Sequence, residues 1–136
     1  IGASEGLSSK SLDNEIKKKY FLNTAASLAY KAVAEMKSLT RKLNGKAESA
    51  FGLAGLGDLY VSSAGGRNSK MGYYLGQGHL FKEAKEKFMK DITVEGADLA
   101  HEIGPKILKE FEEKEFPLLF SVIKCICNNQ KLEINW

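Results

Sequence analysis

The sequence contains few residues that form covalent or metal cross-links. Among its 136 residues are 2 cysteines and 2 histidines. The cysteines, Cys125 and Cys127, lie two positions apart in an apolar run typical of a helix, where a disulfide between them has poor geometry. No second pair of cysteine or histidine residues offers a zinc site. We therefore expect no bound metal, and buried, reduced thiols in a cytoplasmic protein.

Long apolar runs are also missing. None approaches the ~20 residues that a membrane-spanning helix needs. The first residues, Ile1–Gly6, have neither the basic nor the apolar region of a signal peptide. The sequence also lacks an initiator methionine. We therefore expect no membrane span and interpret the chain as part of a longer protein.

The charge balance does not indicate a nucleic-acid partner. The formal net charge is only +3, and acidic residues are interleaved with the lysines. We interpret the lysines at 17–19 and 82–90 as solvated faces. With 43% hydrophobic residues and only 2 prolines, the chain can bury a core of one domain.

The spacing of apolar residues predicts an all-α fold, because no segment shows the alternation typical of a strand. Helices are expected over residues 22–43, 48–53, 67–75 and 80–89, from 95 or 97 to 111, and over 117–128. Residues 1–20 have the pattern of a loop or a frayed helix. The run Asp58–Ser63 is compatible with a strand or a helical turn. Gly104-Pro105 is expected to kink or split its helix.

Two glycine-rich stretches carry the strongest functional signal. The run Phe51–Asp58 sets a carboxylate after small residues, and Gly65–Asn68 sets a cation and an amide after two glycines. Glycine exposes its N–H group and allows positive φ. An arginine side chain and the N–H groups of a helix start both favour an anion. This pattern indicates a site for a polar, anionic small molecule.

Neither of two glycine runs, at residues 52–57 and 76–78, fits the dinucleotide-binding fingerprint. Gly52, Gly55 and Gly57 give G-x-x-G-x-G, the wrong order for G-x-G-x-x-G, and no strand precedes them. In Gly76-Gln-Gly78 the third position falls on Phe81, so this segment is interpreted as a helix-ending turn. The chain is expected to carry no Rossmann element.

Several short motifs together resemble one enzyme family. The order GLAGLGDL, GGRN, GQG and VEG is similar to that of the C-terminal, substrate-binding domain of NAD(P)-dependent glycerol-3-phosphate dehydrogenases. The resemblance runs from about Asn23 to Asn128, with a looser match at Ile1–Leu7. It implies a multi-helix domain of the 6-phosphogluconate-dehydrogenase-like type over residues 1–136, without the N-terminal Rossmann domain. It also implies a helix at Asp58–Ser63.

The resemblance assigns roles to seven residues. It implies a catalytic and substrate-binding role for Asp58, beside the reacting hydroxyl, with Ser62 near the same site. It implies phosphate binding by Gly66, Arg67 and Asn68. Arg67 is also expected to contact the dinucleotide, together with Thr93 and Glu95. Without that context, each of these residues has an ordinary structural explanation, such as a helix cap or a surface charge.

The implied whole enzyme interconverts sn-glycerol 3-phosphate and dihydroxyacetone phosphate with NAD or NADP. The implied catalytic lysine and the nucleotide-binding half lie upstream of Ile1, so the chain alone is expected to be inactive. Family members are commonly dimers, and a homodimer remains open. The alternative is a stand-alone helical module that binds a phosphorylated metabolite or a partner helix.

Overall fold

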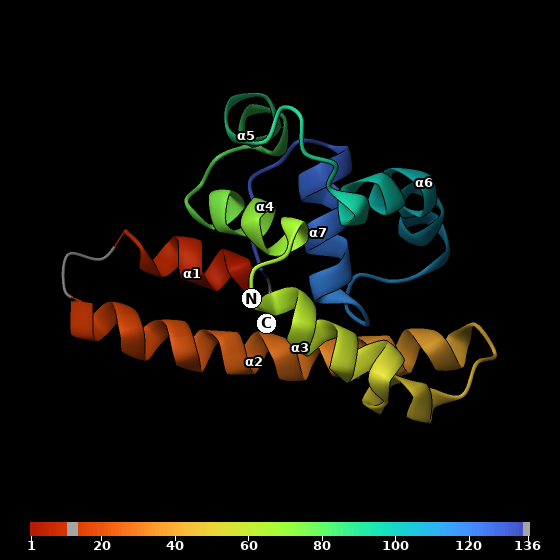
Figure 1. The fold of residues 1–136 in the computed structure, drawn as a ribbon. Helices are drawn as coiled ribbons and strands as arrows, with labels where there is room; N and C mark the ends of the chain where they lie inside the picture. Colours follow the sequence, from red (N-terminus) through yellow and green to blue (C-terminus); the bar gives the residue numbers. More distant parts are fainter. Residues whose placement is uncertain (11–13, 135–136) are drawn as a thin grey trace.

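The protein is a stack of helices (Figure 1), and its computed structural model describes residues 1–10 and 14–134. Within these residues there is no strand, so the prediction of an all-α fold is confirmed. The elements are α1 (Gly2–Ser8), α2 (Asn14–Lys42), the 3-10 helix η1 (Ala47–Phe51), the π-helix η2 (Leu53–Gly57), α3 (Asp58–Ser63), α4 (Arg67–Gly76), α5 (Phe81–Phe88), α6 (Glu95–Glu110) and α7 (Pro117–Cys127).

The long helix α2 forms one side of the molecule, with α1 alongside it and α4, α5, α6 and α7 beyond (Figure 1). It ends at Lys42, and in the turn that follows Asn44 has a left-handed φ of 60°, while the N–H of Gly45 donates to the carbonyl of Thr40 over 2.8 Å. The chain then returns through η1 and η2, which lie against α2, and enters α3. The run Asp58–Ser63 is therefore helical, as the family resemblance implied.

The interpretation of residues 1–20 as a loop or frayed helix was wrong for the part that the structure describes, and residues 11–13 lie outside the described residues. Residues 2–8 form α1, which packs on α4, and α2 already begins at Asn14. The contact is very close because glycines face it from both helices. A Cβ added to Gly2 would lie 2.1 Å from the carbonyl oxygen of Ser69, and one added to Gly76 would lie 2.0 Å from that of Ala3. Glycine weakens an isolated helix but permits this approach between two of them.

The hydrophobic core lies between α4, α5, α6 and α7. Its main cluster consists of Met71, Leu75, Phe81, Ala84, Met89, Val94, Ala97, Ala100, Cys125 and Ile126. A second cluster joins the far ends of α6 and α7 through Ile107, Phe116, Phe120 and Ile123. These clusters fix the start of α6 beside the start of α4.

Helix α6 runs unbroken through Gly104-Pro105, so of the two expected effects, a kink or a split, the split is wrong. Gly104 is buried against α7, where a Cβ would lie 2.8 Å from Ile123 Cγ2. Pro105 faces solvent. Water can therefore satisfy the carbonyl that proline leaves without its helical donor.

Candidate functional site

The site begins with the turn that joins α3 to α4. Asp58 opens α3 on an exposed position, and the hydroxyl of Ser62, one turn later, donates to Asp58 Oδ2 over 3.4 Å. Gly65 has a φ of +138°, a conformation that side-chain-bearing residues rarely adopt. This glycine turns the chain so that α4 starts close to the end of α3.

The first turn of α4 carries three of the predicted site residues. Gly66 is the residue before the helix, with extended backbone, and Arg67 and Asn68 are the first two helical residues. The N–H of Gly66 donates to the carbonyl of Ser62 over 3.4 Å. Within the described residues, no side chain caps this helix. The backbone N–H groups of its first turn are therefore left without a side-chain acceptor, at the positive end of the helix dipole.

The start of α6 meets the start of α4. The N–H of Gly96 donates to Asn68 Oδ1 over 3.0 Å, and the guanidinium of Arg67 pairs with the carboxylate of Glu95 through Nη2 and Oε1. A Cβ at Gly96 would lie 3.0 Å from Asn68 Oδ1, so a glycine suits this contact. Because the oxygen of the Asn68 amide accepts from Gly96, its Nδ2 group is left to donate elsewhere.

The Arg67–Glu95 pair is exposed to solvent. The side chains of Arg67 and Glu95 are 52% and 67% exposed. Such an ion pair adds little to stability, because water screens both charges. It holds a guanidinium and a carboxylate side by side at the surface, both within reach of a ligand.

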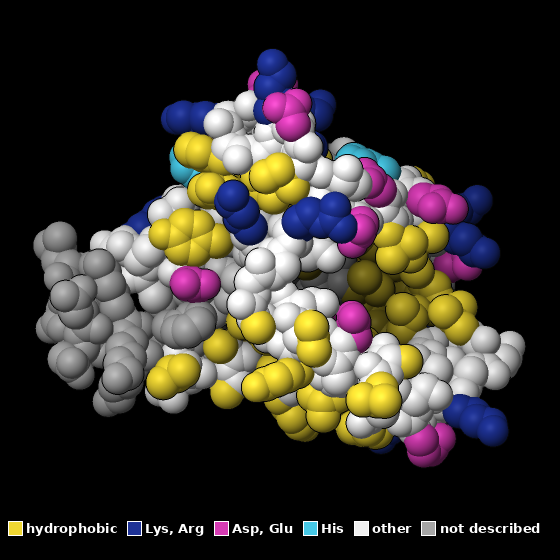
Figure 2. Space-filling view, viewed as in Figure 1, with side chains coloured by type: hydrophobic (Ala, Val, Ile, Leu, Met, Phe, Trp, Pro, Cys, Tyr) yellow, Lys and Arg dark blue, Asp and Glu magenta, His cyan; other side chains and the backbone are white. Residues whose placement is uncertain are grey.

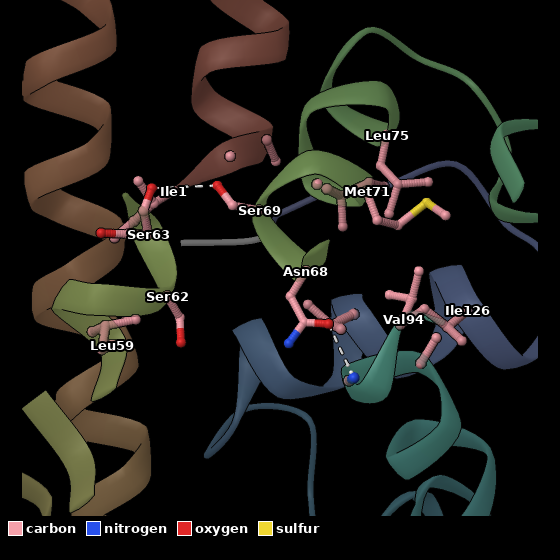
Figure 3. A pocket seen from close by; sticks show the side chains of 17 residues that line it. Ile1, Leu59, Ser62, Ser63, Asn68, Ser69, Met71, Leu75, Val94 and Ile126 are labelled. Atoms are coloured by element: carbon pink, nitrogen blue, oxygen red, sulfur yellow. Dashed lines mark hydrogen bonds between the residues drawn. The ribbon is translucent and has the colours of Figure 1, made fainter. Parts of the chain in front are cut away.

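A cavity of about 340 Å³ lies beneath this junction (Figure 3). Ser62, Ser69 and Asn68 line its polar side, and the hydroxyl of Ser69 donates to the carbonyl of Ser63 over 3.4 Å. Met71, Leu75, Val94 and Ile126 are among the apolar side chains that line it. Figure 2 shows the hollow on this face, with hydrophobic side chains inside it and acidic ones at its edge.

The predicted residues therefore fall into two groups. Asp58 and Ser62 share α3, and within the described residues the Asp58 carboxylate accepts a hydrogen bond from Ser62 alone. Arg67, Asn68 and Glu95 meet at the junction of α4 and α6. Thr93 is exposed in the segment that leads into α6. The structure brings the second group together and leaves Asp58 on the neighbouring helix.

Two residues that contribute to the candidate site were not predicted from the sequence. Gly96 supplies the N–H that holds Asn68, and its only sequence signal was its place in the motif Val94-Glu95-Gly96. Lys85 was interpreted as part of a solvated face, and this was wrong. It is half-buried, and its ammonium donates to the carbonyls of Met89, Lys90 and Ile92, in the segment before α6.

The remaining chemistry of the described residues is limited. They contain no group of histidine, cysteine and acidic side chains that could hold a metal ion. No described helix is long and apolar enough to cross a membrane. Cys125 is fully buried in the core, and burial raises the pKa of its thiol to about 11. This thiol is therefore protonated at neutral pH and is a poor nucleophile.

Comparison with known proteins identifies the family. Residues 16–135 match the family described as NAD-dependent glycerol-3-phosphate dehydrogenase C-terminus. The chain belongs to this family. The resemblance stated from its motifs is thereby confirmed.

Curated relatives agree with this assignment. An NADP(+)-dependent glycerol-3-phosphate dehydrogenase of Archaeoglobus fulgidus is 34% identical over 116 residues, which cover 82% of this chain and 33% of the relative. A glycerol-3-phosphate dehydrogenase [NAD(P)+] of Clostridium acetobutylicum is 36% identical over 109 residues, 79% of this chain and 32% of the relative. The chain thus spans about a third of the length of these relatives. No solved structure matches it significantly.

Proposed function

We propose that residues 1–136 form the substrate-binding domain of a two-domain NAD(P)-dependent glycerol-3-phosphate dehydrogenase. The whole enzyme would interconvert sn-glycerol 3-phosphate and dihydroxyacetone phosphate. The observation that carries the proposal is the junction of α4 and α6, where Arg67 meets Glu95 and Asn68 meets Gly96. The family and its glycerol-3-phosphate dehydrogenase relatives support the proposed reaction and cofactor.

The phosphate group is proposed to bind at the start of α4. Three kinds of donor converge there: the backbone N–H groups of the first turn, the guanidinium of Arg67 and the Nδ2 group of Asn68. A phosphate dianion gains from each donor and from the positive end of the helix dipole. The N–H of Gly66 is directed to the carbonyl of Ser62 over a long 3.4 Å contact, which a stronger acceptor can replace.

The cofactor side of the site is proposed to lie at the start of α6. Glu95 is an exposed acceptor beside Arg67, suited to a ribose hydroxyl or a carboxamide, and Thr93 lies two residues earlier. The nicotinamide, when bound, takes up or supplies the hydride. Arg67 lies between the two regions and is proposed to contact both ligands.

Asp58 is proposed to act at the reacting end of the substrate. Oxidation requires a base that takes the hydroxyl proton as the hydride leaves C2, and by the family resemblance a lysine upstream of Ile1 is proposed for that role. An exposed carboxylate on α3 can orient such a lysine and accept from the substrate hydroxyls. Ser62, which donates to Asp58, would hold the carboxylate in place.

A titration of the ¹⁵N-labelled chain tests this assignment. Glycerol 3-phosphate should shift the amide resonances of residues 66–69, and glycerol should not, since it lacks the phosphate. Binding should be weak, because a single wall of the site must offset the lost freedom of the ligand. Arg67→Ala should abolish the shifts, and Lys70→Ala, which changes an exposed lysine of the same helix, should keep them. Equal shifts with glycerol, or shifts that survive in Arg67→Ala, would contradict the proposal.

A further inference from the structure

The side chain of Lys85 spans the end of α5 and the segment that follows it. Its ammonium group donates to the carbonyl oxygens of Met89 over 2.8 Å, Lys90 over 3.0 Å and Ile92 over 2.8 Å. An ammonium has three N–H donors, so all of them are used. The partners lie at or beyond the helix end, where carbonyls lack intrahelical donors and a cation is favoured.

The three hydrogen bonds from Lys85 hold the middle of the segment 89–94. Its two ends are anchored in the core, because Met89 is 0% and Val94 is 4% exposed. Between them, Lys90, Asp91 and Thr93 are exposed. The backbone itself adds one turn bond here, from the N–H of Ile92 to the carbonyl of Met89 over 3.1 Å.

The same segment sets the position of the site residues on α6. It ends at Val94, and the next two residues are Glu95, which pairs with Arg67, and Gly96, which donates to Asn68 over 3.0 Å. A change in the path of residues 90–93 alters where α6 begins. The three carbonyl groups that accept from Lys85 therefore lie only three to seven residues before Glu95 and Gly96, the two residues of α6 that contact α4.

We propose that Lys85 is a positioning residue, which holds segment 89–94 so that Glu95 and Gly96 meet α4. The consequence for ligands rests on the function proposed above: Lys85 fixes the cofactor side of the site without touching the cofactor. Helix α5 can hold the segment in place because a hydrogen bond also fixes the start of the helix. There the N–H of Lys82 donates to Asn129 Oδ1 over 2.9 Å.

Amide hydrogen exchange of the 136-residue chain tests the proposal. In Lys85→Met, exchange at Ile92 and Gly96 should accelerate about tenfold, the scale expected for losing hydrogen bonds to a charged group. Core amides such as that of Ile123 should change much less. Lys82→Met is the matched control, because Lys82 is exposed on the same helix. Equal exchange at Ile92 and Gly96 in both variants overturns the proposal.

A second measurement needs no variant and covers the case in which Lys85→Met fails to fold. In the wild-type chain, the Lys85 ammonium protons should exchange with water more slowly than those of Lys82. Equally fast exchange overturns the proposal. Failure of the Lys85 proposal can be distinguished from failure of the proposed function. If Glu95→Gln leaves the cofactor KM of the intact enzyme unchanged, the role of Glu95 is refuted, while the exchange data still decide the role of Lys85.

Discussion

Replacing Glu35 by alanine should destabilise the chain through the distant helix α7. Glu35 lies on α2 and is 7% exposed. Its Oε1 accepts from the N–H of Leu118 over 2.9 Å, and its Oε2 accepts from that of Leu119 over 3.0 Å. The residue before α7, Phe116, makes no side-chain cap, and Pro117 has no N–H group. The carboxylate of Glu35 therefore caps α7 from another helix.

The size of the effect follows from these two bonds. Each buried donor left without a partner costs about 1–3 kcal/mol, and a charge at a helix N-terminus contributes about 0.3–1 kcal/mol. Water can reach part of the vacated space, since Glu35 also lines an apolar cavity of about 340 Å³ between α2 and α7. We expect Glu35→Ala to lower the free energy of unfolding by about 2–4 kcal/mol. Glu35→Gln keeps one acceptor and should lose about half of that.

Urea unfolding followed by circular dichroism measures the change, with an unaltered m value as the check that the same transition is compared. The melting temperature should fall by about 5–15 °C, because each kcal/mol shifts it by about 2–4 °C in a chain of roughly this size. Glu102→Ala is the control, because Glu102 is an exposed helical glutamate. If Glu35→Ala and Glu102→Ala unfold at the same urea concentration, Glu35 does not cap α7.

Three further predictions concern the site and the core. In the intact enzyme, Asp58→Asn should lower kcat more than substrate affinity, and an unchanged kcat across pH would make Asp58 structural only. The 136-residue chain alone should not reduce NAD with glycerol 3-phosphate, which absorbance of the reduced cofactor checks. Because burial raises the pKa of Cys125 from 9.0 to about 11, the folded chain keeps this proton while the unfolded chain releases it. The free energy of unfolding should therefore fall as pH rises from about 9 to 11. Urea unfolding at several pH values measures this, and the free energy of Cys125→Ala should fall less steeply over the same range.

The longer helices were predictable because their apolar residues repeat at helical spacing. Helix α7 begins at Pro117, a favoured first-turn residue, and it ends at Cys127, one residue before the expected end at Asn128. Helix α1 was missed because Gly2 and Gly6 weaken an isolated helix. Its stability comes from close packing on α4, a tertiary contact that local pattern does not report.

The candidate site could be predicted in its residues but not in its contacts. Glycine chemistry and the family resemblance pointed to Arg67, Asn68 and Glu95. The pairing of Arg67 with Glu95 joins positions 28 residues apart, and folding alone brings them together. The same holds for Glu35, which lies on α2 but caps α7, and at shorter range for Lys85, whose role depends on the path of the chain after α5.

The central claim is that the start of α4 binds the substrate phosphate, and the kinetics of Arg67→Ala in the intact enzyme test it most directly. Loss of a charge-assisted clamp should weaken transition-state stabilisation by about 2–4 kcal/mol. The value of kcat/KM for glycerol 3-phosphate should therefore fall about 30- to 1,000-fold, much of it through a higher KM. Lys70→Ala, an exposed lysine on the same helix, should leave kcat/KM unchanged. An Arg67→Ala enzyme with the wild-type kcat/KM would contradict the account.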